Sequence, residues 1–220
     1  MNIAIDGPAG AGKSTIAKLV AKNLGSIYVD TGAMYRAMAL FMIKNNVDPK
    51  DIEAIEKTCE NADISITYEN GAQHVILNGE DVTPFLRTEE VGNMASVSSA
   101  NQCVRTKLVA LQQKLAKTTS VVMDGRDIGT VVLPDAQVKI FLTASAQARA
   151  MRRTLQLEQK GEPADYEKIL EDIIKRDHND STREIAPLKP AEDSIIVDTT
   201  DLDLEQSVNK IKELIKRRMK

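Results

Sequence analysis

Residues Gly7-Pro8-Ala9-Gly10-Ala11-Gly12-Lys13-Ser14 carry the strongest indication of fold in this chain. They fit the pattern G-x-x-x-x-G-K-[ST] at every fixed position. The glycines let the backbone curl without Cβ clashes, so that successive N–H groups point inward and can bind an anion. Lys13 can then reach the β- and γ-phosphates, and the Ser14 hydroxyl can bind Mg²⁺. The stretch therefore predicts a nucleoside triphosphate site that runs from Gly7 to Thr15.

The residues on either side of this loop support the same interpretation. A β-branched apolar run ends at Asp6, and apolar residues recur at helical spacing at Ile16, Leu19, Val20 and Leu24. A phosphate loop of this kind joins a strand to a helix, whose positive end faces the anion. The expected order of strand, loop and helix is therefore present. A glycine-rich turn that binds nothing is the alternative.

Composition excludes several classes of protein. The chain has 220 residues, 42 % of them hydrophobic, which is enough for one sizeable α/β domain. Its net charge of −3 gives no broad positive surface for nucleic acid, so any anion site must be local. Cys59 and Cys103 lack a C-x-x-C spacing, and His74 and His178 lack the spacing of metal ligands. We therefore predict neither a disulfide nor a zinc site, and assign no catalytic role to either histidine.

No segment suggests export or membrane insertion. The chain enters a strand directly, without the basic and apolar regions of a secretory signal. Its longest apolar candidate, Ala37–Ile43, is far shorter than the roughly 18 apolar residues of a membrane span. Together with the cysteine pattern, which fits a reducing compartment, this predicts a cytoplasmic protein with no membrane partner.

Short apolar runs alternate with helical patterns along most of the chain. Strands are predicted near 3–5, 27–29, 121–123, 138–142 and 194–197. Helices are predicted from about Thr15, from about Ala33, and near 145–160, 165–180 and 203–219. This alternation predicts an α/β fold of the P-loop NTPase-like class, with a five-stranded parallel sheet and helices on both faces. Ligands of such sheets bind at the carboxyl ends of the strands.

The region 63–86 departs from this alternation. Three short strand-like runs, at 64–68, 74–77 and 81–83, are separated by Asn70-Gly71 and Asn78-Gly79. Asn-Gly pairs are strong hairpin signals because both residues tolerate positive φ. We therefore predict a small antiparallel β-meander inserted into a single domain that spans 1–220.

Polar residues follow two of the predicted strands. Asp124-Gly125-Arg126-Asp127 comes after one strand, so its charged groups should lie on the same edge of the sheet as the phosphate loop. Arg126 can hold a phosphate, and Asp127 can accept from an amine or act as a general base. A turn held by its own Asp–Arg pair is the alternative. Thr31 and Arg36 follow the second strand; Arg36 is the expected phosphate contact, and Thr31 either binds a ligand or caps the next helix.

Arg176, Asp180 and Arg183 have the spacing of one helix face. They lie at i, i+4 and i+7, so they share a face if the helix runs slightly beyond Asp180. Such a face could bind an anion and a sugar. A solvated, salt-bridged face is the alternative.

Arg149, Arg152 and Arg153 also share a predicted helix face, and a break at Gly161-Glu162-Pro163 follows. Unpaired guanidinium groups this close repel one another unless an anion lies between them. We therefore predict a cationic lid at about 149–163 that covers a triphosphate. A plain exposed helix is the alternative.

Four segments together resemble the bacterial cytidylate kinases. They are GPAGAGKS at 7–14, DTGAMYR at 30–36, DGRDIGTVV at 124–132 and APLKPA at 186–191, and they span nearly the whole chain. Among nucleoside monophosphate kinases, the second and third are specific to this family. The resemblance implies transfer of the γ-phosphoryl group of Mg·ATP to CMP or dCMP, which gives CDP or dCDP and ADP. It also implies a P-loop fold, with the meander as the insert of the bacterial enzymes.

The resemblance also implies roles for individual residues. Cytosine would be contacted by Thr31, Arg105 and Asp127, the ribose by Ser96, Arg176 and Asp180, and the acceptor phosphate by Arg36, Arg126 and Arg183. Lys13, Arg126, Arg183 and Arg152 would be the catalytic cations, Ser14 the metal ligand, and Arg149, Arg152 and Arg153 the lid. We expect ATP and CMP or dCMP as the partners of a monomer.

The chemistry of the residues agrees with this resemblance. A nucleotide phosphate is already ionised near neutral pH, so transfer to it needs cations rather than a general base. Cytosine presents an amine that a carboxylate such as Asp127 can accept, whereas uracil does not. Two alternatives remain: a P-loop kinase for another nucleotide or a hydroxyl-bearing metabolite, with Asp127 or Asp30 as base, and a nucleotide-dependent switch. Against a GTPase-type switch, Asn209-Lys210 lacks the aspartate of N-K-x-D.

Overall fold

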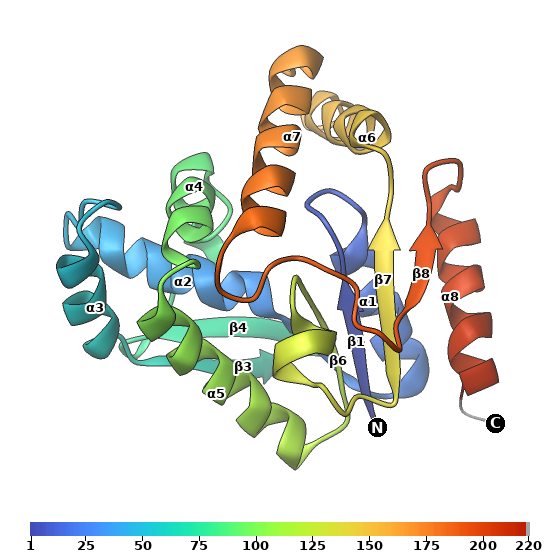
Figure 1. The fold of residues 1–220 in the computed structure, drawn as a ribbon, viewed down its shortest axis with the longest axis horizontal. Helices are drawn as coiled ribbons and strands as arrows, with labels where there is room; N and C mark the ends of the chain where they lie inside the picture. Colours follow the sequence, from blue (N-terminus) through green and yellow to red (C-terminus); the bar gives the residue numbers. More distant parts are fainter. Residues whose placement is uncertain (219–220) are drawn as a thin grey trace.

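The computed structural model describes residues 1–218 and contains a five-stranded parallel sheet, as predicted (Figure 1). Its strands lie in the order β2-β6-β1-β7-β8. Their bounds are Asn2–Asp6 for β1, Ile27–Asp30 for β2, Val121–Gly125 for β6, Val138–Thr143 for β7 and Ile195–Asp198 for β8. Parallel strands all place their carboxyl ends at one edge, which points upward in Figure 1.

The register of the sheet brings carboxylates together at that edge. Asp124 of β6 lies beside Ile5 of β1 on one side and beside Asp30 of β2 on the other. Asp6 lies one residue further along, beside Gly125. The chain segments that follow these strands are therefore neighbours in space, although they are far apart in the sequence.

Eight α-helices and two short helical turns account for most of the remaining described residues. The α-helices are Lys13–Leu24 (α1), Thr31–Lys44 (α2), Ile52–Glu60 (α3), Glu89–Ser98 (α4), Gln102–Thr118 (α5), Ala146–Glu158 (α6), Tyr166–Thr182 (α7) and Leu204–Arg218 (α8). The turns are η1 at Thr83–Phe85 and η2, a π-helical turn, at Ile128–Val132. Five of these helices were expected from the sequence; the last residue of the one predicted over 203–219 lies outside the described range.

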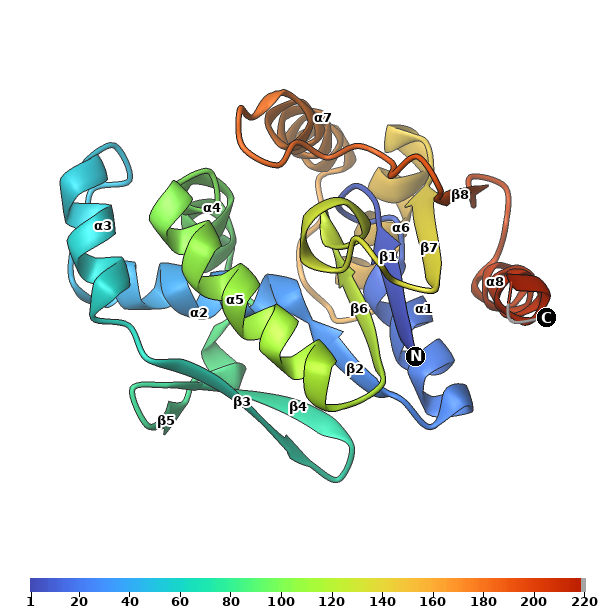
Figure 2. The same ribbon diagram turned by 60° about the horizontal axis from the view of Figure 1, so that its bottom comes forward.

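Hydrophobic cores lie on both faces of the sheet because successive strand residues point to opposite faces. Ile3 and Ile5 of β1 pack in the core that α1 and α8 cover. Ala4, between them, packs in the larger core that α2 and α5 cover. Figures 1 and 2 show α1 and α8 on one side of the sheet and α2 and α5 on the other. The prediction of helices on both faces is confirmed.

The predicted meander is present as a second, antiparallel sheet of three strands. These are β3 (Ile64–Glu69), β4 (Ala72–Leu77) and β5 (Glu80–Asp81). Asn70 and Asn78 both have positive φ, at 51° and 49°, and each is followed by a glycine that does too. The sheet packs against α2 and lies beside β2 (Figure 2). It therefore extends the edge of the main sheet without joining it.

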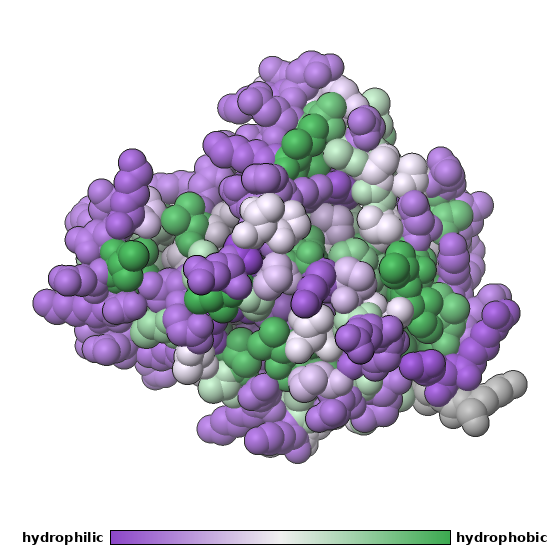
Figure 3. All heavy atoms as spheres, in the orientation of Figure 1, coloured by the Kyte–Doolittle hydropathy of each residue, from purple (hydrophilic) through white to green (hydrophobic). Residues whose placement is uncertain are grey.

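The face of the molecule seen in Figure 3 is mainly polar. Figure 3 shows hydrophilic side chains over most of the face seen in Figure 1, with hydrophobic ones in small separate groups. Within residues 1–218, no helix combines the length and the apolar character needed to cross a lipid bilayer.

Candidate active site

The phosphate loop lies between β1 and α1 and is held tightly against β7. Gly7 has φ of 148°, and a Cβ on it would lie 1.9 Å from the carbonyl oxygen of Leu142. Only glycine fits such a position. Gly12 also has positive φ, 87°, where the loop turns into α1. The local sequence therefore sets the path of the loop before any ligand is present.

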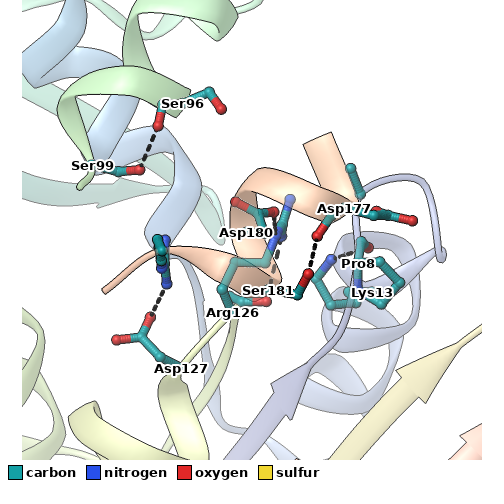
Figure 4. Close-up of polar contacts among 12 residues, drawn as sticks. Pro8, Lys13, Ser96, Ser99, Arg126, Asp127, Asp177, Asp180 and Ser181 are labelled. Atoms are coloured by element: carbon teal, nitrogen blue, oxygen red, sulfur yellow. Dashed lines mark hydrogen bonds and ion pairs between the residues drawn. The ribbon is translucent and has the colours of Figure 1, made fainter. Parts of the chain in front are cut away.

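Lys13 lies buried beneath this loop. Its Nζ donates to the carbonyl oxygen of Pro8 at 2.8 Å (Figure 4). Burial and the nearby Arg126 guanidinium lower the pKa of Lys13 to about 7, and the charges of Asp124 and Asp6 oppose this shift. An anion in the loop would favour the charged ammonium.

Ser14 and Asp124 bring oxygen atoms that could bind a metal ion together beside Lys13. The Ser14 hydroxyl donates to Asp124 Oδ2 at 2.8 Å, and the Tyr28 hydroxyl donates to Asp124 Oδ1 at 2.7 Å. Hydroxyl and carboxylate oxygens suit Mg²⁺, which keeps several waters and binds through one or two protein groups and the substrate phosphates. Among the described residues, no group of three or more His, Cys, Asp or Glu could hold a metal alone. The cluster thus fits Mg²⁺ that arrives with a nucleotide.

Asp6 fixes the segment that follows β6. Its two carboxylate oxygens accept from the backbone N–H groups of Ile128 and Gly129, each at 2.7 Å. Burial raises the pKa of Asp6 to about 6, although these two hydrogen bonds oppose the shift. Because Asp127 immediately precedes Ile128, this contact also fixes the position of the Asp127 backbone.

A pocket of about 290 Å³ opens at the carboxyl edge of the sheet. It lies between the phosphate loop, the start of α2, and residues of α4, α5 and α7. Six arginines and Lys13 line it, against four aspartates. The chain has a net negative charge, so this local positive excess marks the pocket as an anion site.

The start of α2 contributes one wall. Asp30, not Thr31, caps this helix, because Asp30 Oδ1 accepts from the N–H of Ala33 at 2.9 Å. The capping alternative for Thr31 is therefore wrong; its hydroxyl donates to the carbonyl oxygen of Asp124 at 2.7 Å. Asp30 also pairs with Arg36 at 3.4 Å and with Arg87 at 2.9 Å. Two arginines thus stand at this wall beside one carboxylate.

Asp127 is a buried residue of the pocket lining and lies between two arginines. Arg105 of α5 donates to Asp127, and Arg183 lies 3.7 Å from it. Burial raises the pKa of Asp127, and these arginines oppose the shift. The turn is therefore not held by its own Asp–Arg pair.

Arg126 instead reaches across to α7, where its Nε donates to Asp180 Oδ2 at 2.7 Å (Figure 4). Arg176, one turn earlier on α7, donates to Asn93 of α4 at 2.9 Å. The helix ends at Thr182, so Arg183 lies just beyond it and turns inward. These contacts do not fit the alternative of a solvated salt-bridged face.

Three polar atoms around this pocket lack hydrogen-bond partners among the described residues. They are Tyr35 Oη, Arg36 Nε and Arg183 Nη2, and all three are buried. Burial also lowers the pKa of Arg36 and of Arg183. Buried donors without partners are costly unless a ligand supplies an acceptor. The pocket is therefore built to receive an anion that is rich in oxygen.

The three arginines of the predicted lid all have hydrogen-bond partners within the protein. Arg149 is buried, pairs with Asp177 of α7 at 3.0 Å, and donates to the carbonyl oxygen of Ala9 at 2.9 Å. Arg152 donates to the carbonyl oxygens of Thr199 and Leu202, in the loop before α8. Arg153 is directed to Gln156. The break after the helix is present, with Gly161 at φ of 73°.

The pocket brings together most of the residues predicted for it. Its lining includes Lys13, Ser14, Thr31, Arg36, Ser96, Arg105, Arg126, Asp127, Arg176, Asp180 and Arg183. Of the phosphate loop, Ala9 and Gly10 also line it, whereas Arg149, Arg152 and Arg153 do not. Tyr35, Arg87 and Ser99 also line the pocket and are not predicted by the sequence patterns. Tyr35 lies within a quoted motif and could have been found; Arg87 and Ser99 carry no motif signal.

Comparison with known proteins relates the sequence of this chain to one family. Residues 3–217 match the family model described as Cytidylate kinase. A curated cytidylate kinase of Caldicellulosiruptor bescii is 55 % identical over 214 residues, which cover 97 % of this chain and 95 % of the relative. The curated cytidylate kinase of Lactobacillus johnsonii is 51 % identical, and the match covers 100 % of this chain and 96 % of the relative. That of Bacillus subtilis is 46 % identical, and the match covers 99 % of this chain and 97 % of the relative.

Solved structures share the fold at much lower identity. A shikimate kinase from Bacteroides thetaiotaomicron has a TM-score of 0.50 at 13 % identity, with 98 % of both chains covered. An uncharacterized protein from Eubacterium ventriosum has a TM-score of 0.54 at 16 % identity, with 99 % of this chain and 98 % of the other covered. These likenesses concern the fold alone.

Proposed function

The chain belongs to the cytidylate kinase family, and from this premise we propose how its pocket transfers a phosphoryl group from ATP to CMP or dCMP. The proposal assigns the phosphate loop to the donor and the wall formed by α2, α4, α5 and α7 to the acceptor. The observation that carries it is that Asp127 and Lys13 line one pocket. Asp127, which would contact the cytosine, and the phosphate loop, which would hold the triphosphate, could therefore act on two ligands bound side by side.

The donor half consists of residues 7–15. Their backbone N–H groups and Lys13 would hold the β- and γ-phosphates, once Lys13 leaves the carbonyl oxygen of Pro8. Ser14 and Asp124 would hold Mg²⁺, which when bound neutralises charge on the phosphate oxygens. Of the lid arginines, Arg149 lies against the loop at Ala9, and we assign the γ-phosphate contact to it. Arg152 stays a predicted catalytic cation that would first have to leave Thr199 and Leu202.

The acceptor half would bind CMP in three parts. Thr31, Arg105 and Asp127 would contact the cytosine, with Asp127 accepting from its amine. Ser96, Arg176 and Asp180 would contact the ribose. Arg36, Arg126 and Arg183 would hold the phosphate, and we add Arg87 because it stands beside Arg36 at the same carboxylate.

The reaction needs positioning and positive charge more than proton transfer. The acceptor phosphate is ionised before it binds, so no residue has to remove a proton from it. Transfer spreads negative charge over the oxygens of the γ-phosphoryl group, and Lys13, Arg126 and Arg183 would stabilise that charge. In the free pocket aspartates pair with these arginines, so the incoming phosphate replaces carboxylates as their partner.

An assay of ADP release tests this proposal. Mg·ATP would be offered with CMP, dCMP, UMP, AMP, GMP or shikimate singly, beside a control without acceptor. We expect strong stimulation by CMP and dCMP only. Stimulation by another acceptor would refute the cytosine contacts, and hydrolysis that no acceptor stimulates would refute the acceptor half altogether.

A further inference from the structure

The strand β2 is one of the two outer strands of the five-stranded sheet, and side chains of the meander cover its free edge. The N–H of Asp30 donates to Gln73 Oε1 at 2.8 Å, and Gln73 Nε2 donates to the carbonyl oxygen of Asp30 at 3.2 Å. The Tyr68 hydroxyl donates to the carbonyl oxygen of Tyr28 at 3.2 Å. Gln73 and Tyr68 are direct partners across β3 and β4. One face of the meander therefore replaces the missing neighbour strand.

Gln73 contacts this edge at the residue on which the acceptor wall depends. Asp30 is the last residue of β2 and the cap of α2. Its carboxylate holds Arg36 and Arg87, and the next residue, Thr31, reaches Asp124. A shift of the Asp30 backbone would therefore move three of the residues assigned to the acceptor at once.

The phosphate loop itself has no direct contact with Gln73 among the described residues. The phosphate loop follows β1 in the chain and packs against β7, and both are inner strands of the sheet. The described contacts of the Gln73 side chain lie at Asp30 and not at any residue of that loop. Loss of the Gln73 contacts should thus loosen the acceptor wall and leave the phosphate loop in place.

We propose that Gln73 is a positioning residue for the acceptor nucleotide, acting through both hydrogen bonds to the Asp30 backbone. This inference rests on the proposed function, because it takes the wall around Arg36 as the acceptor site. The meander would then hold the acceptor wall around Asp30 in a fixed position relative to the main sheet. A two-sided amide is needed for this, since one end must accept and the other donate.

Gln73→Met tests the inference, because methionine has nearly the same length and lacks both polar ends. His74→Met is the matched control: the neighbouring side chain points to the opposite face of β4 and pairs with Asp81. We expect Gln73→Met to raise the KM for CMP about tenfold, the effect of losing about one net hydrogen bond or two weak ones, and to leave the KM for ATP unchanged. His74→Met should change neither constant.

A second variant keeps the test decisive if Gln73→Met folds poorly. Gln73→Glu retains an oxygen for the Asp30 N–H but sets a second acceptor oxygen against the Asp30 carbonyl, where the two repel, so its KM for CMP should rise at least as far as that of Gln73→Met. Equal rises in the KM for CMP and for ATP, or no rise in either variant, would overturn the inference. Wild-type enzyme without CMP-stimulated activity would instead overturn the proposed function.

Discussion

Arg105 and Asp127 form a buried ion pair that joins α5 to the segment after β6. Their side chains are only 4 % and 6 % exposed. Charges so far from water are tolerated only when each partner compensates the other. The pair is therefore already formed in the free pocket, and the second carboxylate oxygen of Asp127 faces Arg183.

The first prediction concerns this carboxylate. Asp127→Asn should reduce the preference for CMP over UMP at least tenfold, measured as the ratio of their kcat/KM values. An amide can donate to the carbonyl oxygen of uracil, whereas the carboxylate accepts only from the amine of cytosine; one such hydrogen bond is worth about 1–3 kcal/mol. Asp180→Asn, assigned to the ribose, should weaken both nucleotides without changing the ratio. An unchanged ratio in Asp127→Asn would contradict the assignment.

The second prediction is a pH dependence of ATP binding. Free Lys13 has a pKa of about 7, below its ordinary value of 10.5, and bound phosphates should restore the higher value. Above pH 7 binding must therefore take up a proton, and the affinity should fall by up to about tenfold per pH unit. Asp6, with a pKa of about 6, stays ionised in this range.

Calorimetry checks this prediction directly. At pH 8, titrations of ATP in two buffers with different ionisation enthalpies should report uptake of about one proton. Lys13→Arg, which keeps its charge at this pH, should show almost no uptake. Equal uptake in both proteins would assign the proton to another group.

The third prediction separates the lid arginines. Arg149→Ala should lower kcat at least tenfold, because it removes a cation from the phosphate loop and the ion pair to Asp177. Arg153→Ala is the control, since Arg153 lies on the same helix and, among the described residues, its guanidinium hydrogen-bonds to Gln156 alone. It should leave kcat within about twofold. Equal losses in the two variants would mean that the general charge of the helix matters more than the Arg149 contacts.

The fourth prediction concerns the seat of the phosphate loop. Gly7→Ala should lower the free energy of unfolding by about 3 kcal/mol or more, because its Cβ would collide with the Leu142 backbone. Gly25→Ala is the matched control: its φ is also positive, at 63°, but the space around it is open. Its cost should be about 1–2 kcal/mol. Urea denaturation of both variants measures the difference, and equal costs would contradict the proposed collision.

Local patterns predicted much of the fold. The phosphate loop, the five strands of the main sheet and the meander were all predicted, because glycine spacing, apolar runs and Asn-Gly pairs are local signals. No element was predicted between 87 and 120, where α4 and α5 lie. A signal for α4 was available: Thr88 caps the helix, and Val91, Met94, Ala95 and Ser98 follow at helical spacing.

Which residues line the site could be predicted better than which of their side chains pair with one another. Arg126 pairs with Asp180 and Arg149 with Asp177, over separations of 54 and 28 residues. Which carboxylate meets which guanidinium depends on helix placement, and residue spacing within one segment carries no information about that. The spacing that predicted a shared helix face for Arg149, Arg152 and Arg153 could not show that Asp177 of α7 would lie against Arg149. The site roles, the monomeric state and the cytoplasmic location stay predictions.

The contact between the meander and β2 has a further consequence, for solubility. An uncovered outer strand offers a row of free N–H and C=O groups that another chain can pair with. Gln73 and Tyr68 occupy these groups at Asp30 and Tyr28. A shortened enzyme without the meander would therefore expose a template for aggregation next to its substrate entrance. Any trimming of this fold has to protect that strand first.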